Sequence, residues 1–197
     1  MASTYILVDG ENIDATLGTC ILKHQPRPEE RPRWDRVLNY EVFDTDVESD
    51  PENEDPEDPT RGLFYLNASF HVASNFIQAL LAIGWRPILL TSEDPEIKIV
   101  DVGIQKTLEA IIKDRPGANV VLASHDADFI PQIRDLLDAG HEVAVMCFRE
   151  FLSIQLAQLE ERGLVIIDLE HDVNAFNVPL QRLAPVDIAA FDPYQYI

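Results

Sequence analysis

The sequence contains few cysteines and no long apolar run. Its 197 residues include only Cys20 and Cys147, too few for a disulfide framework, so we predict free thiols in a reducing compartment. No apolar run approaches the ~20 residues that a membrane-spanning helix needs. The amino terminus has no basic stretch before its first apolar run, unlike a signal peptide. We therefore expect a cytoplasmic protein with no membrane partner.

Motifs of several enzyme classes are also missing. There is no glycine-rich phosphate loop of the P-loop or Rossmann type, and no Cys/His spacing of a zinc site. No serine or cysteine stands in a recognisable nucleophile motif. These absences disfavour nucleotide binding, structural zinc and covalent catalysis.

Basic residues are scarce. The chain has 15 Lys and Arg against 35 Asp and Glu, a net charge of −20. Residues 44–58 hold nine of the acids and no base, and the rest of the chain still has a balance of −11. This charge argues against tight, indiscriminate binding of nucleic acid through a basic face. It leaves room for an enzyme in which bound cations supply local positive charge.

Apolar runs of strand length alternate with helical patterns. The runs lie at residues 4–8, 63–67, 87–91, 119–123, 142–147 and 164–168, and the helical patterns at 34–43, 71–83, 100–113, 129–139 and 150–162. Nearly continuous Val, Ile and Leu is typical of strands covered on both faces. The alternation predicts parallel strands joined by helical crossovers. We expect one α/β domain at residues 1–170, folded as a three-layer α/β/α sandwich.

Two segments fall outside this alternation. Residues 44–61, rich in Asp, Glu and Pro, are predicted to be a disordered, solvated insertion. Residues 171–197 have little periodicity but contain several large apolar side chains. This tail either packs on the domain or docks a partner.

Acidic residues follow three of the predicted elements. Asp9 ends the first strand, and Asp126 and Asp128 follow the fourth. Asp101 lies near the start of the helix after the third strand. Ligand sites in parallel sheets collect beyond the carboxyl ends of the strands, where the strand order reverses. If the first and fourth strands are neighbours, these carboxylates share one pocket.

Clustered carboxylates repel one another unless a positive charge lies among them. A divalent cation such as Mg²⁺ supplies that charge and supports phosphodiester hydrolysis. Each residue also has a structural interpretation. Asp9 could belong to a turn, Asp126 or Asp128 could be a helix N-cap, Asp101 could be a solvated first-turn acid, and Asn12 could cap a short helix.

Three segments resemble, in order, the signatures of the NYN domain, the LabA-like branch of the PIN-like nuclease superfamily. They are VDGENI at residues 8–13, KIVDV at 98–102 and SHDADFIP at 124–131. The resemblance implies a PIN-like, mainly parallel sheet of five or six strands with the first and fourth adjacent, and a site for Mg²⁺ or Mn²⁺. It places the metal-binding and catalytic acids at Asp9, Asp101, Asp126 and Asp128, and substrate-binding residues at Asn12, Ser124 and Lys98.

The sequence departs from the family pattern at two positions. His125 replaces the usual glycine, and we expect a titratable ring on the rim of the site, where its protonation would compete with metal binding. Thr107 replaces an acid that many relatives carry, which would weaken a second metal.

A basic segment precedes the acidic insertion. Arg27, Arg31, Arg33 and Arg36 surround Trp34, a composition that suits a channel for single-stranded nucleic acid. The alternative, which we favour slightly, is a solvated helix face whose arginines pair with the acidic insertion.

Two functions follow. The first is a metal-dependent endoribonuclease that acts on single-stranded or structured RNA, a substrate implied by the resemblance. The second is a non-catalytic regulatory or scaffold module that binds RNA, a protein partner or a second copy of itself. Retention of all four carboxylates favours the first, because a scaffold gains nothing from keeping like charges together.

Overall fold

The computed structural model describes residues 3–43, 60–69, 73–182 and 186–195. Its sheet has six strands: β1 Thr4–Asp9, β2 Arg61–Asn67, β3 Arg86–Leu90, β4 Asn119–Ala123, β5 Val143–Cys147 and β6 Val165–Asp168. The order is β3-β2-β1-β4-β5-β6, and all neighbouring strands are parallel. The predicted strands and the adjacency of the first and fourth are confirmed. The order reverses between β1 and β4, where a ligand site is expected.

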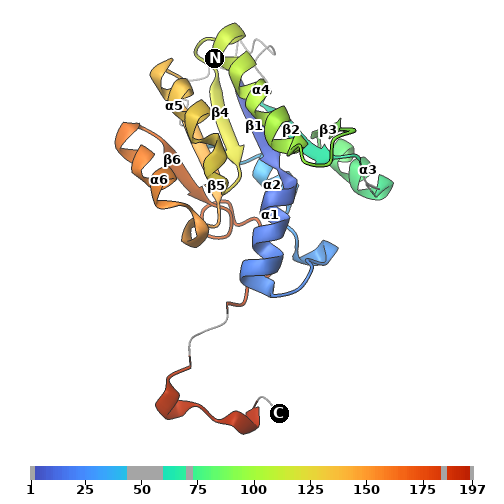
Figure 1. Cartoon of the computed structure of the whole chain (residues 1–197), viewed down its shortest axis with the longest axis vertical. Helices are drawn as coiled ribbons and strands as arrows, with labels where there is room; N and C mark the ends of the chain where they lie inside the picture. The colour runs from blue at the N-terminus through green and yellow to red at the C-terminus, as the bar shows by residue number, and fades with distance from the viewer. Residues whose placement is uncertain (1–2, 44–59, 70–72, 183–185, 196–197) are drawn as a thin grey trace, which may run out of the picture.

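Helices cover both faces of the sheet (Figure 1). The α-helices are α1 Gly10–Thr16, α2 Trp34–Leu38, α3 Ser74–Ala82, α4 Ile99–Asp114, α5 Ile130–Asp138 and α6 Ile154–Ala157. A π-helix, Leu17–Leu22, continues α1, and single 3₁₀ turns occupy Pro28–Glu30, Ala127–Phe129, Arg149–Phe151, Gln158–Arg162, Ile188–Ala190 and Pro193–Gln195. None of the helices in the described ranges is long and apolar enough to cross a membrane.

The core has two halves, one on each face of the sheet. Successive strand residues point to opposite faces, so Leu7 packs under α4 and α5 while Ile6 and Val8 pack under α1 and α2. The residues of the central strands β1, β4 and β5 that build both halves are almost completely buried. This arrangement is the predicted three-layer α/β/α sandwich.

Several helical boundaries differ from the predictions. The helix predicted at 34–43 ends at Leu38, where the side chain of Asn39 donates a hydrogen bond back to the carbonyl of Asp35. The helix predicted at 150–162 is broken into three short pieces, because Ser153 starts a new helix as its N-cap. The segment at 10–22 is longer than the short helix we expected, and its cap is Asp9 rather than Asn12.

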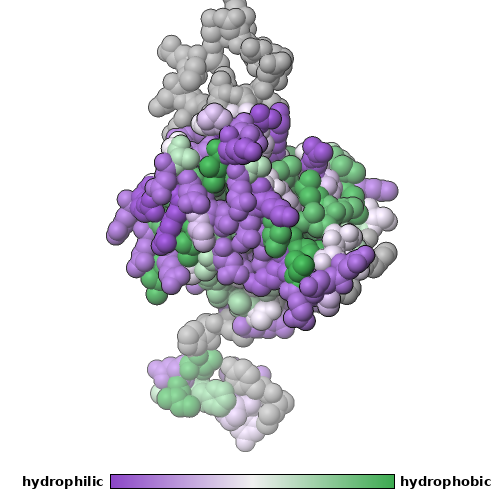
Figure 2. Space-filling view, turned by 45° about the horizontal axis from the view of Figure 1, so that its top comes forward, coloured by the Kyte–Doolittle hydropathy of each residue, from purple (hydrophilic) through white to green (hydrophobic). Residues whose placement is uncertain are grey.

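The segment after β6 packs on the domain only in part. Leu169, Val173, Phe176 and Leu180 are buried in the α1 half of the core. Residues 186–195 lie away from the domain and carry hydrophobic side chains that face solvent (Figures 1 and 2). The predicted insertion overlaps β2, which begins at Arg61, and its residues 44–59 lie outside the described residues.

Candidate active site

Asp9 ends β1 and lies at the point where the strand order reverses. Its side chain is only 2% exposed and accepts a hydrogen bond from the Asn12 amide at 3.1 Å, which makes Asp9 the N-cap of α1. The hydroxyl of Ser124, just after β4, lies 3.3 Å from its other oxygen. Burial raises the pKa of Asp9 to about 6, and the negative charges of Asp101 and Glu11 add to this effect.

Three more carboxylates lie near Asp9 at the same edge of the sheet. Asp101 lies in the first turn of α4, and Asp126 and Asp128 lie in the segment after β4. Each offers one oxygen, and these oxygens lie within 4.8 Å of one another. Asp126 is the N-cap of a 3₁₀ turn through its Oδ1, 2.8 Å from the Asp128 amide, so its Oδ2 remains for another partner. Its structural and metal-binding interpretations are therefore compatible.

Lys98 lies among these three carboxylates. Its Nζ is 2.9 Å from Asp128 Oδ2, 3.5 Å from Asp101 Oδ2 and 3.8 Å from Asp126 Oδ2. The hydrogen bond to Asp128, with the neighbouring negative charges, raises the pKa of the lysine. The cluster thus already holds one cation, supplied by the chain itself.

A cavity of about 290 Å³ joins the buried Asp9 to the partly exposed Asp101 and Asp126. Its lining includes Asp9, Asn12, Lys98, Asp101 and Asp126. It also includes Glu11 and Asn67, which the sequence analysis missed; the Asn67 amide donates to Glu11 Oε1 at 3.3 Å. Both could have been found from position, since Asn67 ends β2 and Glu11 follows β1 at the same edge of the sheet.

The prediction for His125 was wrong. The ring is buried, stacks on Phe148 at 5.5 Å between centroids and accepts a hydrogen bond from the Phe148 amide at Nε2, 2.7 Å away. Its Nδ1 lies 3.0 Å from Asn12 Oδ1, so this nitrogen carries the proton of a neutral ring. Burial lowers the pKa of His125 to about 4. His125 therefore holds Asn12 in place and is not a titratable group on the rim.

Thr107 has a structural partner in this chain. Its hydroxyl accepts a hydrogen bond from the Tyr65 hydroxyl at 2.7 Å and donates one to the Gly103 carbonyl at 2.9 Å. Thr107 thus ties α4 to β2.

The arginine-rich segment does not form a stacking channel around Trp34. The indole is 6% exposed and packs edge-on against Phe64 and Trp85, so no base can stack on it. Among the described residues, Arg33 pairs with Asp35, and Arg36 donates to backbone carbonyls of the segment after β6. The predicted pairing with the acidic insertion falls on residues outside the described ranges.

The donor set suits a hard divalent cation. Three carboxylate oxygens converge at the mouth of the cavity, and oxygen donors are those that Mg²⁺ and Mn²⁺ prefer. Of the four acids predicted as ligands, Asp101, Asp126 and Asp128 form this group, and Asp9 lies near enough for Asp101 to raise its pKa.

Comparison with known proteins supports the fold and the family. No curated protein matches the chain. Among solved structures, a protein of unknown function from Vibrio parahaemolyticus, VPA0982, is similar with a TM-score of 0.59 and 19% identity, over 87% of this chain and 94% of that one. At that identity the likeness shows the fold alone. The model of the NYN domain matches residues 3–162. The chain therefore belongs to the NYN domain family of PIN-like nucleases.

Proposed function

We propose that the protein is a metal-dependent endoribonuclease. The observation that carries the proposal is the group of three carboxylates, Asp101, Asp126 and Asp128, with oxygens within 4.8 Å of one another above the buried Asp9. Family membership supports phosphodiester hydrolysis, and RNA is the substrate that the resemblance implies. The assignment to the LabA-like branch and the cytoplasmic location stay predictions.

Asp101, Asp126 and Asp128 would hold Mg²⁺ or Mn²⁺, with Asp9 as the fourth acid. When bound, the cation supplies a Lewis acid for the scissile phosphate and lowers the pKa of a water nucleophile. The expected products carry a 5′-phosphate and a 3′-hydroxyl. The chain's own contribution is to keep four acids at one edge of the sheet, where burial, and to a smaller extent the neighbouring carboxylates, raise the pKa of Asp9 and of Asp101.

The three predicted substrate-binding residues receive different roles. Ser124 is 1% exposed, and its hydroxyl bonds to Asp9 and accepts from the Asp126 amide at 3.1 Å, so it positions carboxylates rather than contacting RNA. Asn12 lines the cavity and is held by His125. Lys98, exposed at the mouth, is the residue best placed to bind a substrate phosphate once a metal takes its carboxylate partners.

The substitution Asp126→Asn tests this function. Asparagine keeps the oxygen that caps the 3₁₀ turn but removes the charge, so we expect Mg²⁺-dependent cleavage of labelled RNA to fall about 100-fold or more. Asp135→Asn, an exposed acid on α5, is the matched control and should cleave normally.

The same experiment separates the enzyme from the alternative of a non-catalytic module. Undiminished cleavage by Asp126→Asn would disprove the assigned site. Absence of cleavage by the wild type, across Mg²⁺ and Mn²⁺ and with single-stranded and structured RNA, would favour a module that binds RNA or a protein partner. The exposed apolar side chains of residues 186–195 would then be the first surface to examine.

A further inference from the structure

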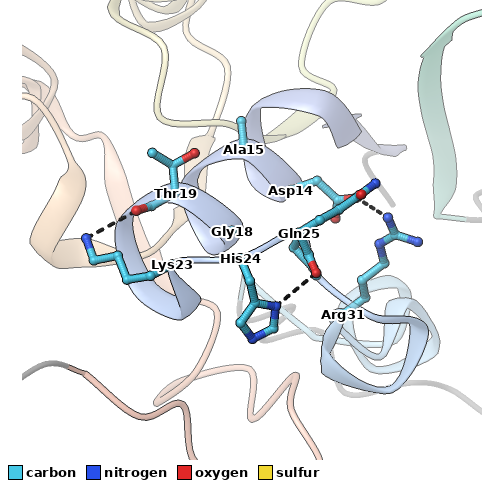
Figure 3. A pocket seen from close by; sticks show the side chains of 9 residues that line it. Asp14, Ala15, Gly18, Thr19, Lys23, His24, Gln25 and Arg31 are labelled. Atoms are coloured by element: carbon cyan, nitrogen blue, oxygen red, sulfur yellow. Dashed lines mark hydrogen bonds and ion pairs between the residues drawn. The ribbon is translucent and has the colours of Figure 1, made fainter. Parts of the chain in front are cut away.

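A second cavity opens beside the candidate active site. It measures about 570 Å³ and lies between α1, its π-helical continuation and the loop that follows (Figure 3). Ala15 lines both this cavity and the one that contains Asp9, so the two are neighbours along one helix. The second cavity thus extends the site toward the end of the π-helix.

The face of the helix that joins the two cavities is exposed, and the side chains in its middle, Ala15 and Thr19, are small. Glu11, Ala15, Thr19 and Lys23 follow one another at intervals of four residues, all solvent-exposed. Asn12 and Lys23 are separated by on the order of 15 Å at the rise of a helix. That length corresponds to about five nucleotides at duplex spacing, and to fewer in an extended strand.

Lys23 occupies a position where glycine is the expected residue. It ends the π-helix with φ of 61°, in the left-handed region. Three other helical segments of this chain end on Gly84, Gly140 or Gly163, each with positive φ. Keeping a lysine there, at a conformational cost that glycine avoids, indicates that its side chain is needed.

The surrounding backbone also has features typical of functional sites. Six residues in π-helical form are rare, and such segments often accompany function. Gly18 lets the following loop return onto the helix, since a Cβ there would lie 2.8 Å from the Pro26 ring and 3.0 Å from the His24 carbonyl. The cavity wall depends on this close approach.

Donors in the cavity are free for an anion. The Lys23 ammonium donates to the Thr19 carbonyl at 3.1 Å, one of its three possible bonds (Figure 3). Arg31 also lines the cavity, and its guanidinium pairs with Asp14 at 2.8 Å. With Asp14 balanced by Arg31, the cavity keeps the positive charge of Lys23 in a strongly acidic protein.

We propose that this cavity binds the single-stranded part of the RNA that flanks the scissile phosphate, with Lys23 and Arg31 contacting its phosphates. The inference rests on the proposed function and adds the path of the RNA strand across the protein surface. The part of the path next to Lys23 is lined by the small residues Ala15, Gly18 and Thr19, so the contacts there are to the backbone and carry no sequence preference.

Fluorescence anisotropy of labelled oligouridylates of 3 and 12 nucleotides tests the proposal, with Mg²⁺ present and Asp126→Asn in all proteins to prevent cleavage. Lys23→Gly and Lys23→Gln should bind the 12-mer about fivefold or more weakly. The slope of log affinity against log salt should fall in magnitude by about 0.7, the value for one phosphate contact on a single strand, and 3-mer binding should not change. Lys113→Gln, at the far end of α4, is the control for charge.

Lys23→Gly should also melt no lower than its parent, because glycine adopts this φ without strain. Equal 12-mer binding by the Lys23 variants and their parent would overturn the inference and leave the proposed function standing. If the parent binds neither oligonucleotide and the wild type cleaves no RNA, the proposed function fails, and this inference fails with it.

Discussion

The candidate site has a buried half and an exposed half, and they keep their charges in different ways. Asp9 lies under the protein surface, where desolvation raises its pKa and two neutral hydrogen bonds stabilise it. The exposed half holds Asp101 and Asp126, which are partly exposed, and Asp128, which is exposed, and Lys98 supplies a counter-charge to all three.

Because the two halves differ in burial, substitutions in each half should affect different properties of the protein. The buried half belongs to the packed core, so changes there should alter stability and its pH dependence. The exposed half is screened by solvent, so changes there should alter cation binding far more than folding. Three substitutions test this division, in order of decreasing expected effect.

The largest effect is expected in the buried half, from His125→Gly. The substitution removes a ring stacked on Phe148 and leaves the Phe148 amide without its acceptor, which should cost about 3 kcal/mol of unfolding free energy. Chemical denaturation measures this, with the exposed His171→Gly as control. Because the pKa of His125 is about 4, the pH dependence of metal affinity between about 6 and 8 should not change. A loss below about 1 kcal/mol would contradict the packing assignment.

The second effect concerns Asp9→Asn without metal. The pKa of Asp9 is about 6 in the folded protein against an ordinary 3.8, so the folded state binds the proton more tightly than the unfolded chain. The contribution of Asp9 to the free energy of unfolding is therefore fully present below about pH 4, and it is lost as the pH rises through about 6. Asparagine has no such loss, so the variant should gain about 2–3 kcal/mol over the wild type between pH 4 and 7 in EDTA.

Urea unfolding at several pH values measures this gain, with Asp135→Asn as the matched control. A difference that does not vary with pH would show that Asp9 is ionised at its ordinary pKa. Added Mg²⁺ should reverse the order of stability, because the wild type then holds the cation more tightly.

The smallest effect is expected in the exposed half, from Lys98→Gln. Removal of the ammonium leaves the three carboxylates without their internal counter-charge, so Mn²⁺ should bind about two- to fivefold more tightly. Isothermal titration calorimetry measures the affinity, and Lys113→Gln is the control. Weaker binding than in the wild type would mean that Lys98 helps to hold the cation's ligands rather than competing with it.

Much of the fold could be predicted from patterns that depend on local physics. Buried parallel strands need continuous apolar residues, so all six were visible in the sequence. The short helices were less visible, because a single residue can start or end a helix while the apolar pattern continues: Ser153 caps the start of α6, and Asn39 follows the end of α2. The positions of the acids at strand ends, combined with the family resemblance, were enough to predict that they meet.

Sequence by itself determined the sheet, the family and which acids lie at its carboxyl edge, since these follow from periodicity and from short motifs. Only the tertiary structure decided the state of each side chain. It buried His125 and made it neutral, placed Lys98 among the carboxylates, and joined the cavity at Lys23 to the site through Ala15. The physical reason is that desolvation and charge pairing depend on neighbours far apart in the chain, which no local pattern records.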